Sequence, residues 1–286
     1  MAVKILAGST CDLSPELVAK YDIGIIPLTV TLGEQSGRDG IEITPEDIYA
    51  YVEKSGSLPK TSAVSVGDFV KAFQPWREQG YEVICFCISS FFSSSFQNAC
   101  IAAEEIGGVT PVDTRNLSTG EGLTILRAAE MAKEGRSVEE IVAECQSIIP
   151  RVEASFAVNQ LDYLYKGGRC SALAAFGANL FHIKPAINVK DGRMEPGKKY
   201  RGSIDSVIRH YVEDRLKGRT DIDMHRIFVT HTRCLPETVE SVKAMVKELC
   251  PDVEEILETV AGSTVTTHCG PETLGVLFIR KEDENK

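Results

Sequence analysis

Residues 81–108, YEVICFCISSFFSSSFQNACIAAEEIGG, pass from one kind of secondary structure to another within a few positions. The run at 81–87 is rich in β-branched and aromatic residues, which predicts a buried strand. The segment from Phe96 onward predicts a helix. Between them lie serines and phenylalanines in close alternation, and a buried hydroxyl without a partner is costly. We therefore expect these serines to lie at the carboxyl end of a strand, where parallel sheets bind ligands.

The same alternation of short apolar runs and amphipathic segments continues on both sides of this stretch. It is typical of a mostly parallel sheet covered by helices, and we expect an N-terminal α/β domain over residues 1–155. Beyond Pro150 the pattern changes, and Asp191-Gly192 between two extended runs predicts a hairpin turn. We expect a C-terminal α/β domain with a mixed sheet over residues 156–286. Its last segment, 255–281, predicts two closing strands around a Gly-Pro turn.

Helix starts are marked by capping residues at three places. Ser14 and Thr44 each precede a proline, which favours an N-cap followed by the first helical turn. Ser65 with Asp68 three positions later predicts a capping box. This cap does not need Thr61 and Ser62, which are left to contact a ligand.

The composition excludes several classes of protein. The chain has 286 residues, 43% of them hydrophobic, and its 31 basic against 41 acidic residues give a net charge of −10. This charge argues against a nucleic-acid-binding protein and against adsorption to anionic membranes. No apolar run is long enough to span a membrane, and we expect no stable membrane insertion. Nine cysteines without regular spacing, and a first strand in place of a signal peptide, predict reduced thiols in a cytoplasmic protein.

Two further segments carry candidate binding residues. At 164–185, a Gly-Gly pair precedes Arg169 and follows Lys166, and the helix predicted behind it contains small residues, among them Ala174 and Gly177. Small side chains allow a backbone or a long ligand to approach closely, although an exposed turn with solvated charges also fits. In the second segment, His268 lies beside a Cys-Gly-Pro turn. A lone histidine of this kind is more often structural than catalytic.

Enzyme signatures are mostly absent from the sequence. It contains no GxSxG, HExxH or GxGxxG motif and no paired Cys/His spacing for a metal. Abundant hydroxyls without an identifiable activating base favour binding over catalysis. The alternative left open is a Ser/His enzyme, either a small hydrolase or a phosphotransfer protein that uses His268.

Taken in order, these segments resemble the DegV family of bacterial fatty-acid-binding proteins. The resemblance covers nearly the whole chain and depends on the order and spacing of several short motifs. These are STCDL (9–13), PLTV (27–30), TSAVS (61–65), ISSFFSSSFQNA (88–99), VDTRNLSTGEGL (112–123), LDYLYKGGR (161–169), IKPAINVKDGRM (183–194) and HCGPETLGVLF (268–278).

The resemblance implies a two-domain α/β protein that encloses one long-chain fatty acid between its domains. Hydroxyls and one imidazole would bind the carboxylate: Thr61, Ser62, Ser93 and His268. Apolar or small residues would line the acyl pocket or lie near it: Phe91, Phe92, Phe96, Ala174 and Gly177. Ser94 and Ser95 are expected to cap the following helix. The chain would have no catalytic residues and no cofactor or metal.

The resemblance also implies a partner. In members that act with a fatty acid kinase, the bound acid is presented to a separate ATP-dependent kinase subunit, which converts the carboxylate to an acyl phosphate. Arg169, with Lys166 beside it, would dock that kinase. A lipid sensor without a kinase partner is the remaining alternative. The chain departs from the family pattern at Ser94 and Glu272, where the family has glycine.

Overall fold

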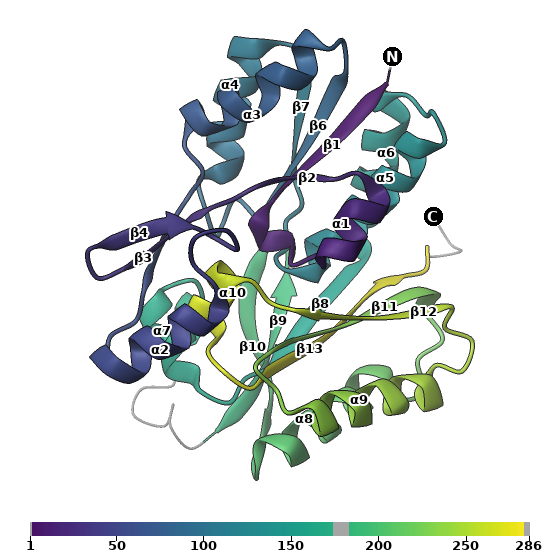
Figure 1. The fold of residues 1–286 in the computed structure, drawn as a ribbon. Coiled ribbons are helices and arrows are strands. Elements are labelled where there is room, and N and C mark those ends of the chain that lie inside the picture. The colour runs from purple at the N-terminus through teal and green to yellow at the C-terminus, as the bar shows by residue number, and fades with distance from the viewer. Residues whose placement is uncertain (1, 174–182, 283–286) are drawn as a thin grey trace.

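The computed structural model describes residues 2–173 and 183–282, and its main strands form two layers (Figure 1). The first layer is a four-stranded sheet of order β2-β1-β6-β7 in which all neighbours are parallel. Its strands are β1 (Val3–Gly8), β2 (Gly24–Ile26), β6 (Glu82–Cys87) and β7 (Val109–Asp113). The predicted parallel sheet with flanking helices is confirmed.

Helices cover both faces of this sheet (Figure 1). On one face lie α3 (Val66–Glu78) and α4 (Ser95–Ile106); on the other lie α1 (Pro15–Tyr21), α5 (Thr119–Lys133) and α6 (Val138–Ile148). Strand β6 shows why both faces are buried. Val83 and Cys85 pack with the helices of the first group, and Ile84 and Phe86 pack with those of the second. Because alternate side chains of a strand point to opposite faces, a continuous apolar run is required here.

The second layer is a six-stranded mixed sheet of order β10-β9-β8-β13-β11-β12. Strands β11 and β12 are parallel, and the other described neighbours are antiparallel. Its strands are β8 (Val152–Ala157), β9 (Lys184–Lys190), β10 (Arg193–Tyr200), β11 (Ile222–Thr232), β12 (Glu255–Val260) and β13 (Thr273–Arg280). The mixed sheet and the Asp191-Gly192 hairpin turn are both confirmed. The division of the chain into two domains at residue 155 stays a prediction.

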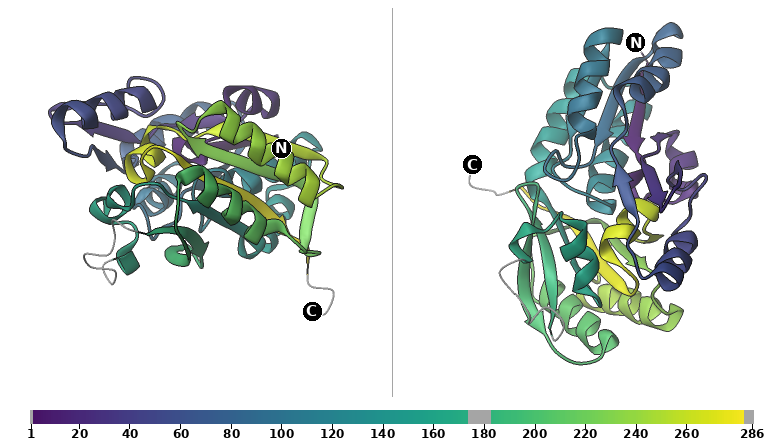
Figure 2. Two further views of the ribbon diagram at one scale, coloured as in Figure 1. Left: turned by 90° about the horizontal axis from the view of Figure 1, so that it is seen from below. Right: turned by 90° about the vertical axis from the view of Figure 1, so that its left-hand side faces the viewer.

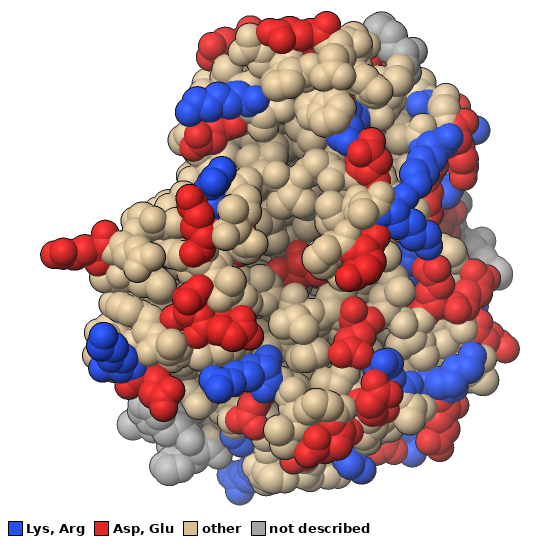
Figure 3. All heavy atoms as spheres, viewed as in Figure 1, with Lys and Arg blue, Asp and Glu red and all other residues tan. Residues whose placement is uncertain are grey.

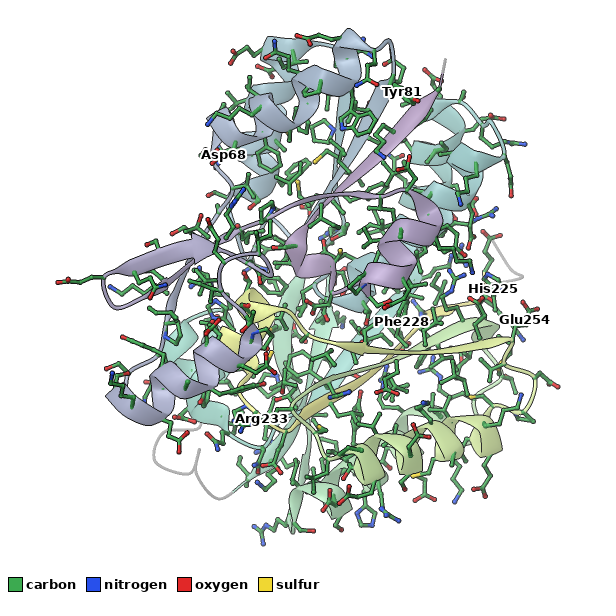
Figure 4. All side chains as sticks on the ribbon, viewed as in Figure 1. Asp68, Tyr81, His225, Phe228, Arg233 and Glu254 are labelled. Carbon is green, nitrogen blue, oxygen red and sulfur yellow. The ribbon has the colours of Figure 1, made fainter. Side chains whose placement is uncertain are left out.

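Helix α5 lies between the two sheets. Leu123 and Leu126 of α5 belong to the same buried cluster as Phe228 of β11 and Leu277 of β13. Figure 4 shows Phe228 in the region between the two layers. The opposite face of the second sheet is covered by α8 (Ile204–Leu216) and α9 (Pro236–Leu249). Because α5 is buried on nearly all sides, the loop that leads into it is also held between the layers.

A small third sheet projects from the first layer. It is antiparallel, has the order β4-β3-β5, and consists of β3 (Thr29–Leu32), β4 (Gln35–Arg38) and β5 (Lys60–Ser62). Helix α2 (Pro45–Ser55) connects β4 to β5 and lies beside the second layer in Figure 2. Strands this short give little sequence signal, and the separate sheet was not predicted. It brings β5 into contact with α10.

The prediction for residues 255–281 is partly wrong. β12 and β13 are strands, but Ser263–Cys269 between them forms the short helix α10. The Thr- and Val-rich sequence favours a strand, yet the first N–H groups of this helix bind distant carboxylates. Gly262 N donates to Asp12 Oδ1 (2.8 Å) and Ser263 N donates to Asp39 Oδ1 (2.8 Å). These tertiary contacts override the local preference.

The three predicted helix N-caps are confirmed, but Ser65 and Asp68 do not complete the predicted capping box, since the Asp68 carboxylate accepts from Ser65 Oγ (2.6 Å) and not from the Ser65 backbone. The side chains of Ser14, Thr44 and Ser65 each accept a hydrogen bond from the backbone three residues later. The small-residue helix predicted after Arg169, with Ala174 and Gly177, lies largely outside the described residues. Within the described ranges, no helix is long and apolar enough to cross a membrane.

Candidate ligand-binding site

A cavity opens where β5, the β6–α4 loop, α10 and the end of α7 (Leu161–Gly167) meet. We call it the head chamber. The space between its atoms, including the part open to solvent, is about 490 Å³, and about 40 Å³ is available to the centre of a water-sized sphere. Both layers contribute to its lining: Leu28, Thr61, Ser62, Ala63, Ile88, Phe92, Ser93, Leu117, Arg169, Met194, Thr264, Val265, His268 and Cys269. The four residues expected to bind a carboxylate, Thr61, Ser62, Ser93 and His268, therefore lie around one cavity.

Thr61 and His268 form the only direct link between two of these four residues in the described part of the chain. Thr61 Oγ1 lies 2.8 Å from His268 Nε2, across 207 positions of sequence. Burial, assisted by the nearby positive charge of Arg169, lowers the pKa of His268 to about 4. At neutral pH the imidazole is therefore uncharged. A neutral imidazole has one donor and one acceptor nitrogen, and it adds no charge to the chamber. Here Nε2 contacts Thr61, and Nδ1 has no hydrogen-bond partner in the described structure.

The Gly-Gly pair at 167–168 has two separate structural roles. Gly168 ends α7 in the left-handed conformation (φ 71°), which a glycine adopts without strain. Gly167 lies against the His268 ring, where an added Cβ would come within 2.5 Å of Nδ1. The pair thus allows α7 and α10 to pack closely enough to place His268 in the chamber.

Arg169 follows this turn and extends from the protein surface to the chamber lining. Its Nε donates to Phe92 O (3.3 Å) and its Nη1 donates to Gly167 O (2.9 Å). Lys166 does not reach the chamber; it is exposed and pairs with Asp162 (3.5 Å). Among the described lining residues, Arg169 is the one permanent cation.

The serines at 89–95 differ in their contacts. Ser89 Oγ donates to Gly192 O (2.8 Å) and so binds the β9–β10 turn to the first layer. Ser93 lines the chamber, and its Oγ lies 3.0 Å from Ser95 Oγ. The expected capping by Ser94 and Ser95 is wrong. Ser94 occupies the N-cap position of α4 without a side-chain bond, and Ser95 Oγ accepts from Val64 N (3.3 Å).

The three phenylalanines of this segment lie in different environments. Phe92 is buried and lines the head chamber. Phe91 lies nearby but is 47% exposed, with the Arg193 guanidinium 3.7 Å from its ring centre. Phe96 packs in the core of the first layer instead, because it lies on the face of α4 turned toward that sheet. Ala174 and Gly177 lie outside the described residues.

A second cavity, which we call the tail chamber, adjoins the first. It shares Leu117, Val265 and Cys269 with the head chamber. The space between its atoms, including the part open to solvent, is about 380 Å³, and about 30 Å³ is available to the centre of a water-sized sphere. Its other lining residues are Ser118, Ala154, Phe156, Thr230, His231, Thr232, Ala261, Thr273, Gly275 and Leu277. The three shared residues show that the two chambers adjoin.

The hydroxyls that line the tail chamber are already bound within the protein. Thr230 Oγ1 lies 2.5 Å from Thr119 Oγ1. Thr232 Oγ1 donates to Gly270 O (2.5 Å), and Thr273 Oγ1 donates to Cys269 O (2.9 Å). These hydroxyls are not free to bind a ligand, which favours an apolar occupant. His231 also lines the chamber, and its ring nitrogens have no hydrogen-bond partner in the described structure.

Sequence reasoning missed several residues around the chambers. Leu117, Met194 and Thr264 line the head chamber, and Asp12 and Asp39 hold the start of α10. Because residues 263–269 were expected to form a strand, the helical spacing of Thr264 and His268 gave no signal. Burial raises the pKa of Asp12 to about 8, although Ser118 Oγ donates to its carboxylate (2.5 Å).

A larger groove, of about 1440 Å³ with its open part included, adjoins the tail chamber and shares Ala154 with it. Its lining is mostly polar and carries charges of both signs, including Arg115, Glu153 and Arg280. Figure 3 likewise shows acidic and basic residues interspersed over one face of the molecule. Unlike the head chamber, this groove has no hydroxyl side chain among its described lining residues.

The two stacked sheets and the paired chambers define an α/β protein with an internal cavity lined from both layers. The family model described as "Uncharacterised protein, DegV family" matches residues 2–281, so the chain belongs to the DegV family. A protein of Thermotoga maritima named "Fatty acid-binding protein" is 33% identical over 285 residues, covering 96% of each chain. A DegV domain-containing protein of Clostridium acetobutylicum is 31% identical and covers 98% of this chain and 99% of its own.

Solved structures agree with this assignment. A fatty-acid-binding DegV family protein from Thermus thermophilus superposes with a TM-score of 0.85 at 30% identity, covering 98% of this chain and 100% of that chain. A stearic acid-binding protein from Eubacterium ventriosum gives a TM-score of 0.79 at 27% identity and covers 98% of both chains. The predicted family is confirmed.

Proposed function

We propose that the protein binds one long-chain fatty acid, with its carboxylate in the head chamber and its acyl chain in the tail chamber. The observation that carries this proposal is that a chamber lined by hydroxyls and a cation adjoins a chamber whose hydroxyls are already bound within the protein. Relatives named for binding fatty acids, one of them with stearic acid, support the same ligand class.

The hydrophobic effect favours the binding of such a ligand. Burial of about fourteen methylenes contributes on the order of 11 kcal/mol before the costs of association. The carboxylate needs short hydrogen bonds in compensation for the water it loses. Thr61, Ser62 and Ser93 supply neutral donors, and Arg169 supplies one positive charge.

We further propose that the protein acts in the cytoplasm and presents the carboxylate to a separate ATP-dependent acyl kinase, which forms the acyl phosphate. Arg169 supports this proposal because it is exposed to a partner and also lines the head chamber. Lys166, exposed on the preceding turn, lies on the same surface segment. All nine cysteines are unpaired, which is typical of a reducing compartment.

The Ser/His enzyme is disfavoured by the surroundings of His268. Its Nδ1 has no hydrogen-bond partner in the described structure, so no carboxylate orients the ring as in a catalytic triad. With a pKa of about 4 it is also a weak base at neutral pH. A fluorophosphonate label that attached to Ser93 would reverse this conclusion.

Native mass spectrometry of the purified protein tests ligand binding. We expect a mass excess equal to one fatty acid, lost after denaturing extraction and restored by oleate. No bound lipid before extraction, and none after oleate addition, would overturn the proposal.

A kinase assay separates a substrate-presenting protein from a lipid sensor. Acyl phosphate should form only with the fatty-acid-loaded protein, ATP and an acyl kinase together. Arg169→Ala should lower kinase turnover far more than it weakens lipid binding. Lys71→Ala, at an exposed side chain of α3, is the control and should change neither. If the fatty-acid-loaded protein supported no turnover with any acyl kinase, the kinase role would be wrong and the lipid sensor would be the favoured function.

A further inference from the structure

Helix α10 carries a second polar side chain to the head chamber. Thr264 lies four residues before His268, and residues at this spacing share one face of a helix. Thr264 is buried (5% exposed) and lines the chamber, and its Oγ1 has no hydrogen-bond partner in the described structure. Burial of an unpartnered hydroxyl is unfavourable, so this oxygen requires a partner that the protein does not supply.

Other hydroxyls of α10 are satisfied within the protein. Ser263 Oγ donates to Ile43 O (2.7 Å), and Thr266 Oγ1 donates to Ala261 O (3.2 Å). Thr267 Oγ1 is also buried without a partner, but Thr267 does not line the chamber. Thr264 alone among these residues combines a free hydroxyl with access to the cavity.

We propose that the Thr264 hydroxyl is a direct ligand of the bound carboxylate, donating to one of its oxygens beside the Thr61–His268 pair. This role rests on the proposed function, since it requires an acid in the head chamber. It adds a second binding residue from α10, on the same helix as His268.

The position of Thr264 is fixed from the start of its helix. The N–H groups of Gly262 and Ser263 donate to Asp12, in the loop after β1, and to Asp39, which follows β4 of the third sheet. Asp39 is fixed in turn by Ser9, whose Oγ donates to Asp39 Oδ2 (2.8 Å). Because protein carboxylates occupy the first N–H groups of α10, the ligand is bound by side chains of this helix and not by its N-terminus. Asp12 and Asp39 are therefore positioning residues.

The test compares Thr264→Val, which keeps the shape of the side chain, with oleate and methyl oleate as ligands of delipidated protein. Loss of a hydrogen bond to a charged group weakens binding roughly tenfold or more. We expect Thr264→Val to bind oleate roughly tenfold more weakly and methyl oleate as before, and Thr264→Ser to resemble the wild type. Thr267→Val is the matched control and should change neither affinity.

An equal loss for the two ligands, or the same loss in Thr267→Val, would overturn the role of Thr264. Unchanged oleate binding by Thr264→Val would overturn it as well, and would leave the proposed function intact. Failure of the wild type to bind oleate would overturn the proposed function itself.

The positioning role of Asp39 is tested with the same two ligands. Asp39→Ala should lower the preference for oleate over methyl oleate, because α10 loses the acceptor for Ser263 N. Asp39→Asn should restore that preference, since an amide oxygen accepts the same bond. If both variants lost affinity for the two ligands equally, Asp39 would have no positioning role.

Discussion

The head and tail chambers each contain four hydroxyl side chains, but the protein uses them differently. In the tail chamber, Thr230, Thr232 and Thr273 are bound to other protein groups, and Ser118 donates to Asp12. In the head chamber, the Thr264 hydroxyl is unpartnered. Thr61 Oγ1 bonds to His268 of the same site, and Ser93 Oγ contacts Ser95 Oγ (3.0 Å) and accepts from Ser95 N (3.2 Å).

This difference shows that residue type alone does not make a cavity polar. A threonine whose hydroxyl is hydrogen-bonded to another protein group presents only its methyl group to the cavity. A threonine without such a partner presents a hydrogen-bond donor. A polar head and an apolar tail can therefore be accommodated by walls of similar composition. The predictions below change one chamber at a time.

The largest effect should come from filling the tail chamber. Ala154 lines it, and Ala154→Leu would exclude part of the acyl chain. Exclusion of about three methylenes loses roughly 2–3 kcal/mol, so palmitate affinity should fall by about 100-fold. Octanoate, which need not reach that end, should bind as before. Displacement of a fluorescent fatty acid measures both.

Ala157→Leu is the control for this experiment. Ala157 is equally buried on the same strand but packs in the core beneath α8 and α9, on the opposite face of the sheet. Both variants overpack a core, at about 1–3 kcal/mol of stability. If Ala157→Leu weakened palmitate as much as Ala154→Leu, the tail chamber would not hold the acyl chain.

A smaller effect is expected from Thr61→Val in the head chamber. The change removes a donor to the carboxylate and the partner of His268 Nε2. Hydrogen bonds to charged groups contribute about 1.5–3 kcal/mol, so oleate should bind roughly 10- to 100-fold more weakly. Methyl oleate should be much less affected. Equal weakening of acid and ester, measured by displacement, would show that Thr61 shapes the cavity without binding the head group.

The first layer was largely predictable from sequence. The apolar run at 82–87 indicates a strand buried on both faces, and Ser14, Thr44 and Ser65 mark helix starts through contacts three residues away. The strand and the helix caps depend on residues close together in sequence, so the sequence pattern predicts them. The placement of Thr61, Ser93 and His268 around one cavity was expected only through the family resemblance.

Helix α10 was not predictable in the same way. Its first N–H groups bind Asp12 and Asp39, which are more than 200 positions away in sequence. No local pattern reports such partners, and the sequence STVTTHC favours a strand. The separate contacts of Ser93, Ser94 and Ser95 are equally invisible, because Val64, a residue of another loop, decides the role of Ser95.

Thr230→Val should affect stability and not binding, in contrast to Thr61→Val. The Thr230 hydroxyl contacts Thr119 (2.5 Å) and Thr259 (3.0 Å), and its loss leaves buried partners unsatisfied. We expect a loss of about 1–3 kcal/mol in the free energy of unfolding, measured by urea denaturation. The affinity for oleate, corrected for the folded fraction, should be unchanged. A tenfold weaker affinity for oleate would mean that this hydroxyl faces the ligand.

The smallest effect distinguishes the two histidines of the chambers. His268 lines the head chamber, where burial and the Arg169 charge lower its pKa to about 4, and burial also lowers the pKa of His231 beside the tail chamber. A lowered histidine pKa means that the unfolded chain binds a proton which the folded chain does not, so His268 makes the protein less stable as pH falls from about 6.5 toward 4. Arg169→Ala removes the charge, and the pKa of His268 should rise while that of His231 stays the same. Titration of the imidazole signals by NMR, in delipidated protein, measures both. If the pKa values of His268 and His231 moved together, the change would reflect altered burial. If neither pKa moved, Arg169 would not act on the head chamber through its charge.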